Sequence, residues 1–132
     1  MVQFTSKELE FIKENECCRL STSIENKSHV VPVSYLFYDN HFYFTTDYNT
    51  KKFSNIKKNP YVGLVIDIYK VDGNKGLTLQ GSSRILEHGQ TFNAIYSLLF
   101  QKFDWVKNDP WKEYEAPIIE ITALSKSSWC IN

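Results

Sequence analysis

Short β-type segments alternate with tight turn signals along most of the chain, and this alternation limits the fold more than any other feature. The segment "CCRLSTS" ends at the turn "ENKS", and "HVVPVSYLFY" ends at Asp39 and Asn40, which precede "HFYFTT". The segments "YVGLVIDIY" and "LTLQGSSRIL" flank "DGNKG". Connections this short join antiparallel neighbours, because parallel strands need a crossover of roughly a dozen residues or more. The sequence therefore predicts a mainly β, antiparallel fold.

Three helices are expected at the margins of these strands. Thr5 and Glu8 have the spacing of a capping box, which predicts a helix to about residue 15. Apolar residues recur at helical spacing from about residue 91 to residue 103. Phe53 and Ile56 lie three apart and would seat a short lysine-rich helix on the core. We expect six or seven antiparallel strands, closed into a barrel, with marginal helices, in a single domain over residues 1–132.

Two residues mark irregular positions within the predicted strands. Pro32 cannot donate a ladder hydrogen bond, so its segment is expected at a sheet edge or a bulge. Gly81 interrupts "LTLQGSSRIL" and indicates a bulge or a close backbone approach. A tryptophan-rich irregular piece is expected up to Pro117, followed by one or two further strands.

The balance of charge limits the partners of this chain. Fifteen basic side chains oppose fifteen acidic ones, so neither nucleic acid nor a membrane surface is an expected partner. No run approaches the roughly 20 apolar residues of a membrane span, and "MVQFTSKELEF" does not have the pattern of a secretory signal. We expect a cytoplasmic protein whose three cysteines are reduced, because an odd set with two adjacent members is unsuited to a disulfide framework.

The sequence lacks the motifs of several common chemistries. It contains no glycine-rich phosphate loop, no serine nucleophile elbow and no "HExxH". Its three histidines are not paired at metal-ligand spacing with cysteine or carboxylate, so no metal site is expected. Cys17 and Cys18 lack the "CxxC" separation of redox pairs, which favours thiols embedded in a strand. No catalytic residue is assigned.

The stretch "FTTDYNTKKFSNIKKNP", residues 44–60, contains an electrostatic anomaly. Its helix would open on Thr50, Lys51 and Lys52, although the positive end of a helix favours acidic side chains. Free amides, a hydroxyl and two lysines are the parts of a phosphate site, and Thr45 and Thr46 end the strand beside it. The alternative is a solvated helix face on which the lysines have no ligand. The residues alone leave both interpretations open.

Other candidate side chains are equally open at this level. Arg19 lies on the polar face of the first strand and is either a second cation for a ligand or a solvated, salt-bridged side chain. Trp105, Trp111 and Trp129 either stack on a planar ligand or fill the core or a subunit interface.

The segment "PVSYLFYDNHFYFTTDYNTKKFSNIKKNPYVGLVI" resembles the signature of the flavin-binding split β-barrel family related to pyridoxamine 5'-phosphate oxidase. The resemblance rests on the order of a Pro-Val strand, an Asp-Asn hairpin, an aromatic strand ending in Thr-Thr, Thr-Lys-Lys and "NIKKNPYV". It extends from "CCRLSTS" to the terminal "SSW". It implies a split barrel that forms a homodimer, with two flavin mononucleotide (FMN) molecules at the subunit interface.

The resemblance also implies which residues bind the cofactor. Residues 50–52 would hold the phosphate, residues 45–46 would bind the ribityl chain or the ring edge, and residues 32–34 would lie along the isoalloxazine. Gln80 is a further candidate, and Trp129 would act across the dimer. Together with Arg19, the candidate cofactor-binding residues are Pro32, Val33, Ser34, Thr45, Thr46, Thr50, Lys51, Lys52, Gln80 and Trp129.

The chain departs from the family pattern in two places. The family's usual Ser-Arg-Lys or Ser-x-Lys is Thr50-Lys51-Lys52 here, which replaces a bidentate guanidinium with a point charge. The sequence stops at "SSWCIN", without the arginine- and histidine-containing segment of pyridoxamine phosphate oxidases proper, so that activity is not expected. The expected function is electron or hydride transfer through bound FMN. The alternatives are a deazaflavin-dependent reductase on the same barrel, or a non-catalytic flavin or haem carrier or sensor.

Overall fold

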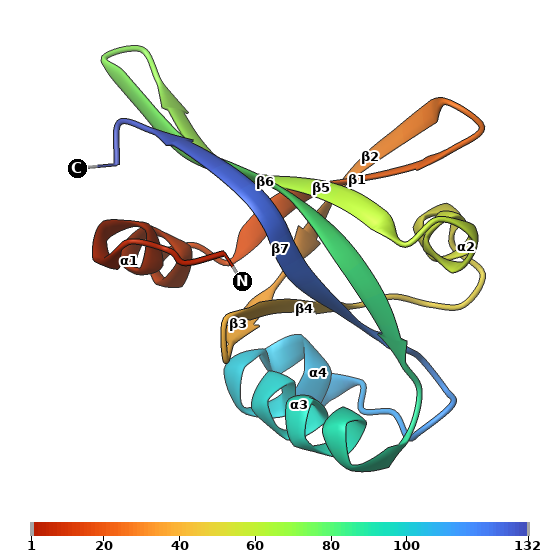
Figure 1. Ribbon diagram of the computed structural model, residues 1–132. Coiled ribbons are helices and arrows are strands. Elements are labelled where there is room, and N and C mark those ends of the chain that lie inside the picture. Colours follow the sequence, from red (N-terminus) through yellow and green to blue (C-terminus); the bar gives the residue numbers. More distant parts are fainter. Residues whose placement is uncertain (1, 132) are drawn as a thin grey trace.

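Residues 2–131 are described in this computed structural model, and they form four helices and seven strands (Figure 1). The helices are α1 (Ser6–Glu14), α2 (Lys51–Lys58), α3 (Gly89–Lys102) and α4 (Asp104–Asn108). The strands are β1 (Cys17–Ile24), β2 (Lys27–Ser34), β3 (Leu36–Tyr38), β4 (His41–Thr45), β5 (Tyr61–Lys70), β6 (Gly73–Leu86) and β7 (Ile118–Trp129). The predicted mainly β fold with marginal helices is confirmed.

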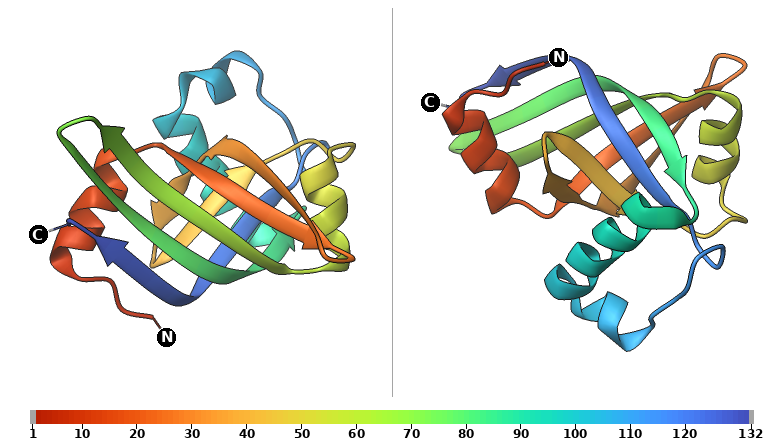
Figure 2. Two further views of the ribbon diagram at one scale, coloured as in Figure 1. Left: turned by 90° about the horizontal axis from the view of Figure 1, so that it is seen from above. Right: turned by 60° about the horizontal axis from the view of Figure 1, so that its bottom comes forward.

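The seven strands form one antiparallel sheet in the order β2-β1-β5-β6-β7-β4-β3. The sheet curls round on itself (Figure 2), and the larger of two clusters of buried side chains lies inside the curl. Its edge strands, β2 and β3, are consecutive in the chain and are joined at Tyr35. Within residues 2–131 no hydrogen-bonded ladder joins these two edges. The predicted barrel is therefore a split barrel, closed by the chain itself and not by backbone pairing.

Tyr35 holds the two edges of the split together. Its side chain is fully buried, and its hydroxyl donates a hydrogen bond to the carbonyl oxygen of Ile12 at 2.6 Å. Its backbone N–H donates to the carbonyl oxygen of Glu16 at 2.9 Å, and its own carbonyl accepts from Lys102 Nζ at 3.1 Å. Because the buried polar groups of Tyr35 are paired, the split costs little in unsatisfied hydrogen bonding.

The local signals in the sequence predicted their structures correctly. Thr5 and Glu8 form the reciprocal capping box of α1, with side chain to backbone distances of 2.9 and 3.1 Å. Glu25–Asn26 and Asp39–Asn40 both have positive φ at their two residues, as tight antiparallel hairpins require. Pro32 lies in the edge strand β2, where its missing N–H leaves no ladder bond unmade.

Gly81 marks the irregularity that was predicted for its strand. The register between β6 and β7 shifts between Gln80 and Gly81. A Cβ atom at Gly81 would lie 2.7 Å from Ile121 Cγ2 and 2.9 Å from the carbonyl oxygen of Thr122. Both predicted features, a bulge and a close approach, are present at this residue.

Two expectations about boundaries were wrong. The turn between β5 and β6 is at residues 71–72, and "GNKG" belongs to β6, where Gly76 is needed because the ring of Trp129 occupies the place of a Cβ atom. The piece expected to be irregular contains α4, which buries Val106 completely. The C-terminal segment, expected as one or two strands, is a single strand, because the long strand β6 offers it partners from Gly76 to Leu86.

The buried side chains form two clusters that support different parts of the molecule. The larger cluster fills the barrel and includes Phe53 and Ile56, which seat α2 as predicted. The second cluster lies between α3 and the sheet and includes Phe92 and Val106, with Trp111 packed against it. In Figure 1, α3 and α4 lie below the strands, whereas α2 lies beside them. Among residues 2–131, no helix is both long enough and apolar enough to cross a bilayer.

Candidate functional site

The N-terminus of α2 has the composition that the sequence predicted. Thr50 is the N-cap residue, and its hydroxyl oxygen accepts from the backbone N–H of Phe53 at 3.4 Å. The first turn, all of it within the described residues, contains no acidic side chain. The backbone amides of Lys51 and Lys52 point out of the helix end, where an α-helix has no intrahelical acceptor for them. Two cationic side chains and two free amide donors therefore share this end.

Thr46, the residue that follows β4, contacts the N-terminus of α2. Its side chain is 7% exposed, and its hydroxyl oxygen lies 2.8 Å from that of Thr50. Both hydroxyls also lie within donor distance of the carbonyl oxygen of Asp47, Thr50 at 3.0 Å and Thr46 at 3.2 Å. Thr45 is tied elsewhere, with its hydroxyl donating to the carbonyl of Pro117 at 3.0 Å. The structure thus brings together Thr46 and Thr50, two of the predicted site residues.

The loop before α2 is anchored by Tyr48. The ring of Tyr48 packs edge-on against Phe53, and its hydroxyl donates to Glu87 Oε2 at 2.8 Å. Burial, followed by the hydrogen bond to Glu87, raises the pKa of Tyr48 to about 12, so this donor stays protonated at neutral pH. The anchor holds Thr46 and Thr50 in place relative to the barrel.

A buried polar contact that the sequence analysis missed ties α2 to the sheet. Asn55 Nδ2 donates to Thr22 Oγ1 at 3.0 Å, and both residues are buried. Asn59 Nδ2 donates to the carbonyl oxygen of Ser23 at 3.1 Å. The position of Thr22 in the sequence could have predicted this contact. Thr22 lies on the same strand face as Cys18 and Leu20, and a buried hydroxyl needs a hydrogen-bond partner.

Five of the other predicted residues share one face of the sheet. We call it the outer face: the side of β2, β1, β5, β6 and β7 that points away from the larger core cluster. Directly paired residues point to the same side of a sheet. The register therefore places the following residues on the outer face: Arg19, Pro32, Ser34, Gln80 and Trp129. Val33 points the opposite way and packs against the barrel core.

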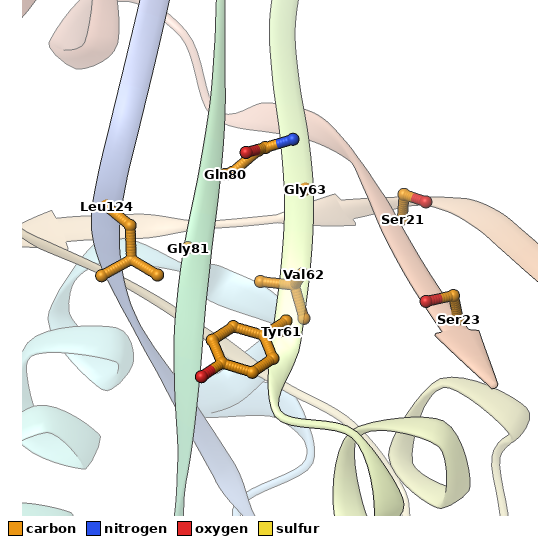
Figure 3. Close-up of a pocket in the computed structure, with 8 residues that line it drawn as sticks. All are labelled: Ser21, Ser23, Tyr61, Val62, Gly63, Gln80, Gly81 and Leu124. Carbon is orange, nitrogen blue, oxygen red and sulfur yellow. The ribbon is translucent and has the colours of Figure 1, made fainter.

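The outer face is hollowed where β1, β5, β6 and β7 run side by side. The hollow has a volume of about 420 Å³, and Figure 3 shows the residues that line it. They are Ser21, Ser23, Tyr61, Val62, Gly63, Gln80, Gly81 and Leu124. The side chain of Leu124 is 55% exposed there. Arg19 lies outside the hollow and is paired with Asp67, so its charge is already engaged within the chain.

Within one chain, Trp129 and the N-terminus of α2 do not form one site. Thr45 pairs with Ile118 at the start of β7, whereas Trp129 ends that strand. At about 3.3 Å per residue, these two positions on β7 are roughly 35 Å apart along the strand. Trp129 of one chain is therefore too distant to share a ligand with Thr45 of the same chain.

A second cavity adjoins the end of β4, and the sequence analysis did not predict it. Its volume is about 380 Å³, and we call it the tryptophan cavity. Its lining residues are Thr45, Thr46, Asp47, Trp105, Asp109, Trp111 and Ala116. The indole rings of Trp105 and Trp111 are nearly parallel, with an interplanar angle of 10° and centroids 6.4 Å apart. The sequence named these tryptophans, but only the fold places them beside Thr46.

The adjacent cysteines do not form a redox pair. Cys17 and Cys18 alternate across β1, so one is exposed and the other buried, and both are free thiols. Burial, with a smaller contribution from Cys17, raises the pKa of the Cys18 thiol to about 12. A thiol with that pKa is almost entirely protonated at neutral pH and is a poor nucleophile.

The fold and the sequence both match a known family. The family model of pyridoxamine 5'-phosphate oxidase matches residues 4–127. This chain belongs to the pyridoxamine 5'-phosphate oxidase family. No curated protein matches the chain in sequence.

Solved structures share the fold of this pyridoxamine 5'-phosphate oxidase family member at low identity. A FAD-binding protein from Mesorhizobium loti is 22% identical, with a TM-score of 0.73, over 91% of this chain and 87% of that one. HutZ, the heme storage protein from Vibrio cholerae, is 11% identical, with a TM-score of 0.81, over 97% and 94%. General Stress Protein 26 from Bacillus anthracis is 19% identical, with a TM-score of 0.73, over 96% and 93%. At these identities the likeness concerns the fold.

Proposed function

We propose that this member of the pyridoxamine 5'-phosphate oxidase family binds FMN, with the phosphate at the N-terminus of α2, and acts as a flavin-dependent redox protein. The observation that carries the proposal is the contact between Thr46 and Thr50 at a helix end with Lys51 and Lys52 and no first-turn acid. A dianionic phosphate bound there would attract both the lysines and the positive helix end, and so would offset the repulsion between them. Bound flavin would supply the redox chemistry, and the protein would supply position and electrostatics.

The residues at this end fit a phosphate group. Hydroxyls, backbone amides and ammonium groups are all donors to phosphate oxygens. Lys51 and Lys52 bring charge without the fixed fork of arginine, so orientation would depend on Thr50 and the amides. Family membership and the FAD-binding structure from Mesorhizobium loti support a flavin as the bound group.

We further propose that the active form is a homodimer in which the outer face of one chain completes the flavin site of the other. The separation of Trp129 from Thr45 along β7 supports this arrangement. In this arrangement, the outer face of one copy would contact the isoalloxazine ring of the flavin held by α2 of the other copy. The residues that would make this contact are Pro32, Ser34, Gln80 and Trp129. The exposed Leu124 and Tyr61 beside the outer-face hollow are apolar groups that a second copy would cover.

Identification of the bound chromophore tests the cofactor. Protein purified from cells and denatured should release FMN in a ratio near one per chain, measured by mass spectrometry and absorbance. Release of a deazaflavin or haem alone, with no FMN bound on reconstitution, would contradict the proposal and favour the corresponding alternative. Oxidation of a nicotinamide cofactor by the FMN-loaded protein would separate an enzyme from a carrier or sensor.

Disruption of the outer face tests the dimer. Leu124→Lys should convert a dimer to a monomer in light scattering after size exclusion, because it places a charge in an apolar contact on both copies. Val71→Lys is the matched control, since Val71 is fully exposed at the tip of the β5–β6 hairpin. A wild-type monomer that binds FMN at full stoichiometry would refute the proposed dimer and leave the cofactor assignment intact.

A further inference from the structure

Two indole rings line the tryptophan cavity, and each of them packs against another aromatic side chain. Tyr96 packs edge-on against Trp111 at 4.9 Å, and its hydroxyl accepts the backbone N–H of Trp111 at 3.1 Å. Trp105 leans on Phe103 with ring centroids 5.5 Å apart. Trp105 remains 44% exposed, so the walls are supported but open to a ligand. Rigid walls lower the entropy that binding must overcome.

The polar groups of this cavity are of one charge type. Asp47 and Asp109 both line it, and its other lining residues carry no charge. The charged side chains of α4, Lys107 and Asp104, pair with each other at 3.5 Å. A phosphate or a carboxylate would be repelled by Asp47 and Asp109, whereas a cation would be attracted by both.

We propose that the tryptophan cavity binds a planar organic cation, such as an N-alkylated pyridinium ring. Indole is the aromatic group that attracts cations most strongly through its ring face, and a flat ring also stacks on it. The carboxylates of Asp47 and Asp109 supply the counter-charge, and Thr45 and Thr46 form the wall toward β4.

The position of the cavity connects it to the proposed flavin site. Thr46 lines the tryptophan cavity and also contacts Thr50 at the N-terminus of α2. A cation in the cavity would therefore lie next to the group held by α2. This connection rests on the proposed function, but binding of the cation by itself does not.

Calorimetric titration with a charged and a neutral ring tests the proposal. The probes are 1-methylnicotinamide, a cation, and nicotinamide, its neutral counterpart, each added to FMN-free and FMN-loaded protein. We expect the cation to bind about tenfold more tightly than the neutral ring, because it faces two carboxylates, both of them solvent-exposed. Equal affinity for the two probes would overturn the proposal.

Variants localise the binding. Asp109→Asn keeps the shape of the side chain. It should lower the affinity for the cation about three- to tenfold and leave the affinity for nicotinamide unchanged. Trp105→Leu should lower the affinity for both probes about tenfold. Asp104→Asn is the matched control on the same helix and should change neither affinity, because Asp104 does not line the cavity. Cation binding that is unaffected by Asp109→Asn and Trp105→Leu would also overturn the proposal.

The two proposals fail in different ways. If the protein binds no FMN but still discriminates the two probes through Asp109, the cation site stands and the flavin function falls. If it binds FMN and does not discriminate the probes, the flavin function stands and the cation site falls.

Discussion

The N-terminus of α2 and the tryptophan cavity adjoin the same residue, Thr46, yet they differ in almost every physical property. One is a helix end with two lysines, hydroxyls and free amides. The other is a hollow with two indoles and two carboxylates. Neighbouring regions of opposite charge select ligands of opposite charge, so the end of β4 can separate an anionic group from a cationic one over a short distance.

The two regions also rest on different parts of the core. Phe53 seats α2 on the cluster inside the barrel, whereas Trp111 packs on the cluster beneath α3. A substitution in one cluster should therefore affect one region more than the other, and the following changes are ordered from the largest expected effect.

The largest effect is expected where α2 is anchored. Phe53→Ala removes a buried ring and should lower the free energy of unfolding by about 3–5 kcal/mol. It should also abolish FMN binding under conditions where the protein stays folded, because α2 loses its main packing contact with the core. Urea unfolding measures the first effect and fluorescence titration the second. Phe100→Ala, on an exposed position of α3, is the control. A loss below about 1 kcal/mol for Phe53→Ala would show that α2 is not anchored by this ring.

The next effect separates the two ends of α2. The double variant Lys51→Ala with Lys52→Ala should weaken FMN about 10- to 100-fold, a loss of about 1.4–2.8 kcal/mol, with the fold intact. Lys57→Ala with Lys58→Ala removes the same charge from the other end of the helix and should leave FMN affinity nearly unchanged. Equal effects of the two pairs would mean that the lysines act only through net charge.

A smaller effect distinguishes a helix cap from a ligand contact. Thr5→Ala and Thr50→Ala each remove an N-cap hydroxyl and should each cost about 1 kcal/mol of stability. Only Thr50→Ala should also weaken FMN, and Thr50→Ser should restore both properties. Equilibrium unfolding and FMN titration of the three variants provide the comparison. FMN affinity that is indifferent to Thr50→Ala would remove this hydroxyl from the phosphate site.

The smallest effect tests whether the two regions influence one another. Asp109→Asn should raise the affinity for FMN by no more than about threefold, or about 0.6 kcal/mol. The substitution removes a carboxylate that repels the phosphate but is screened by solvent. The gain should shrink as salt is added. A weakening of FMN by the same variant would indicate that Asp109 supports the flavin site instead of opposing it.

The local elements of this protein were predictable because their causes lie within a few residues. The capping box needs only Thr5 and Glu8, and the Asp39–Asn40 turn needs two residues that tolerate positive φ. The β5–β6 turn was predicted at residues 72–76 and lies at residues 71–72, because Gly76 serves a distant contact with Trp129. A glycine required by a long-range contact looks the same in sequence as a glycine required by a turn.

The candidate sites were predictable to different degrees for the same reason. Thr50, Lys51 and Lys52 are adjacent in sequence, so their joint position at a helix end followed from the helix alone. The tryptophan cavity joins residues 45–47 to residues 105–116, and no periodicity or spacing connects those segments. Strand alternation alone places Val33 and Ser34 on opposite faces, but only the register of β2 on β1 shows that Ser34 is the one on the outer face.

The sequence by itself determined the antiparallel pairing, the marginal helices and the cationic end of α2, because turn chemistry, capping and helix polarity act locally. Only the tertiary structure decided that the barrel splits at Tyr35, that Arg19 is engaged by Asp67, and that two tryptophans and two aspartates surround one cavity next to Thr46. These arrangements depend on which surfaces the strands and helices bury against each other, and that choice is made by the packing of the whole chain.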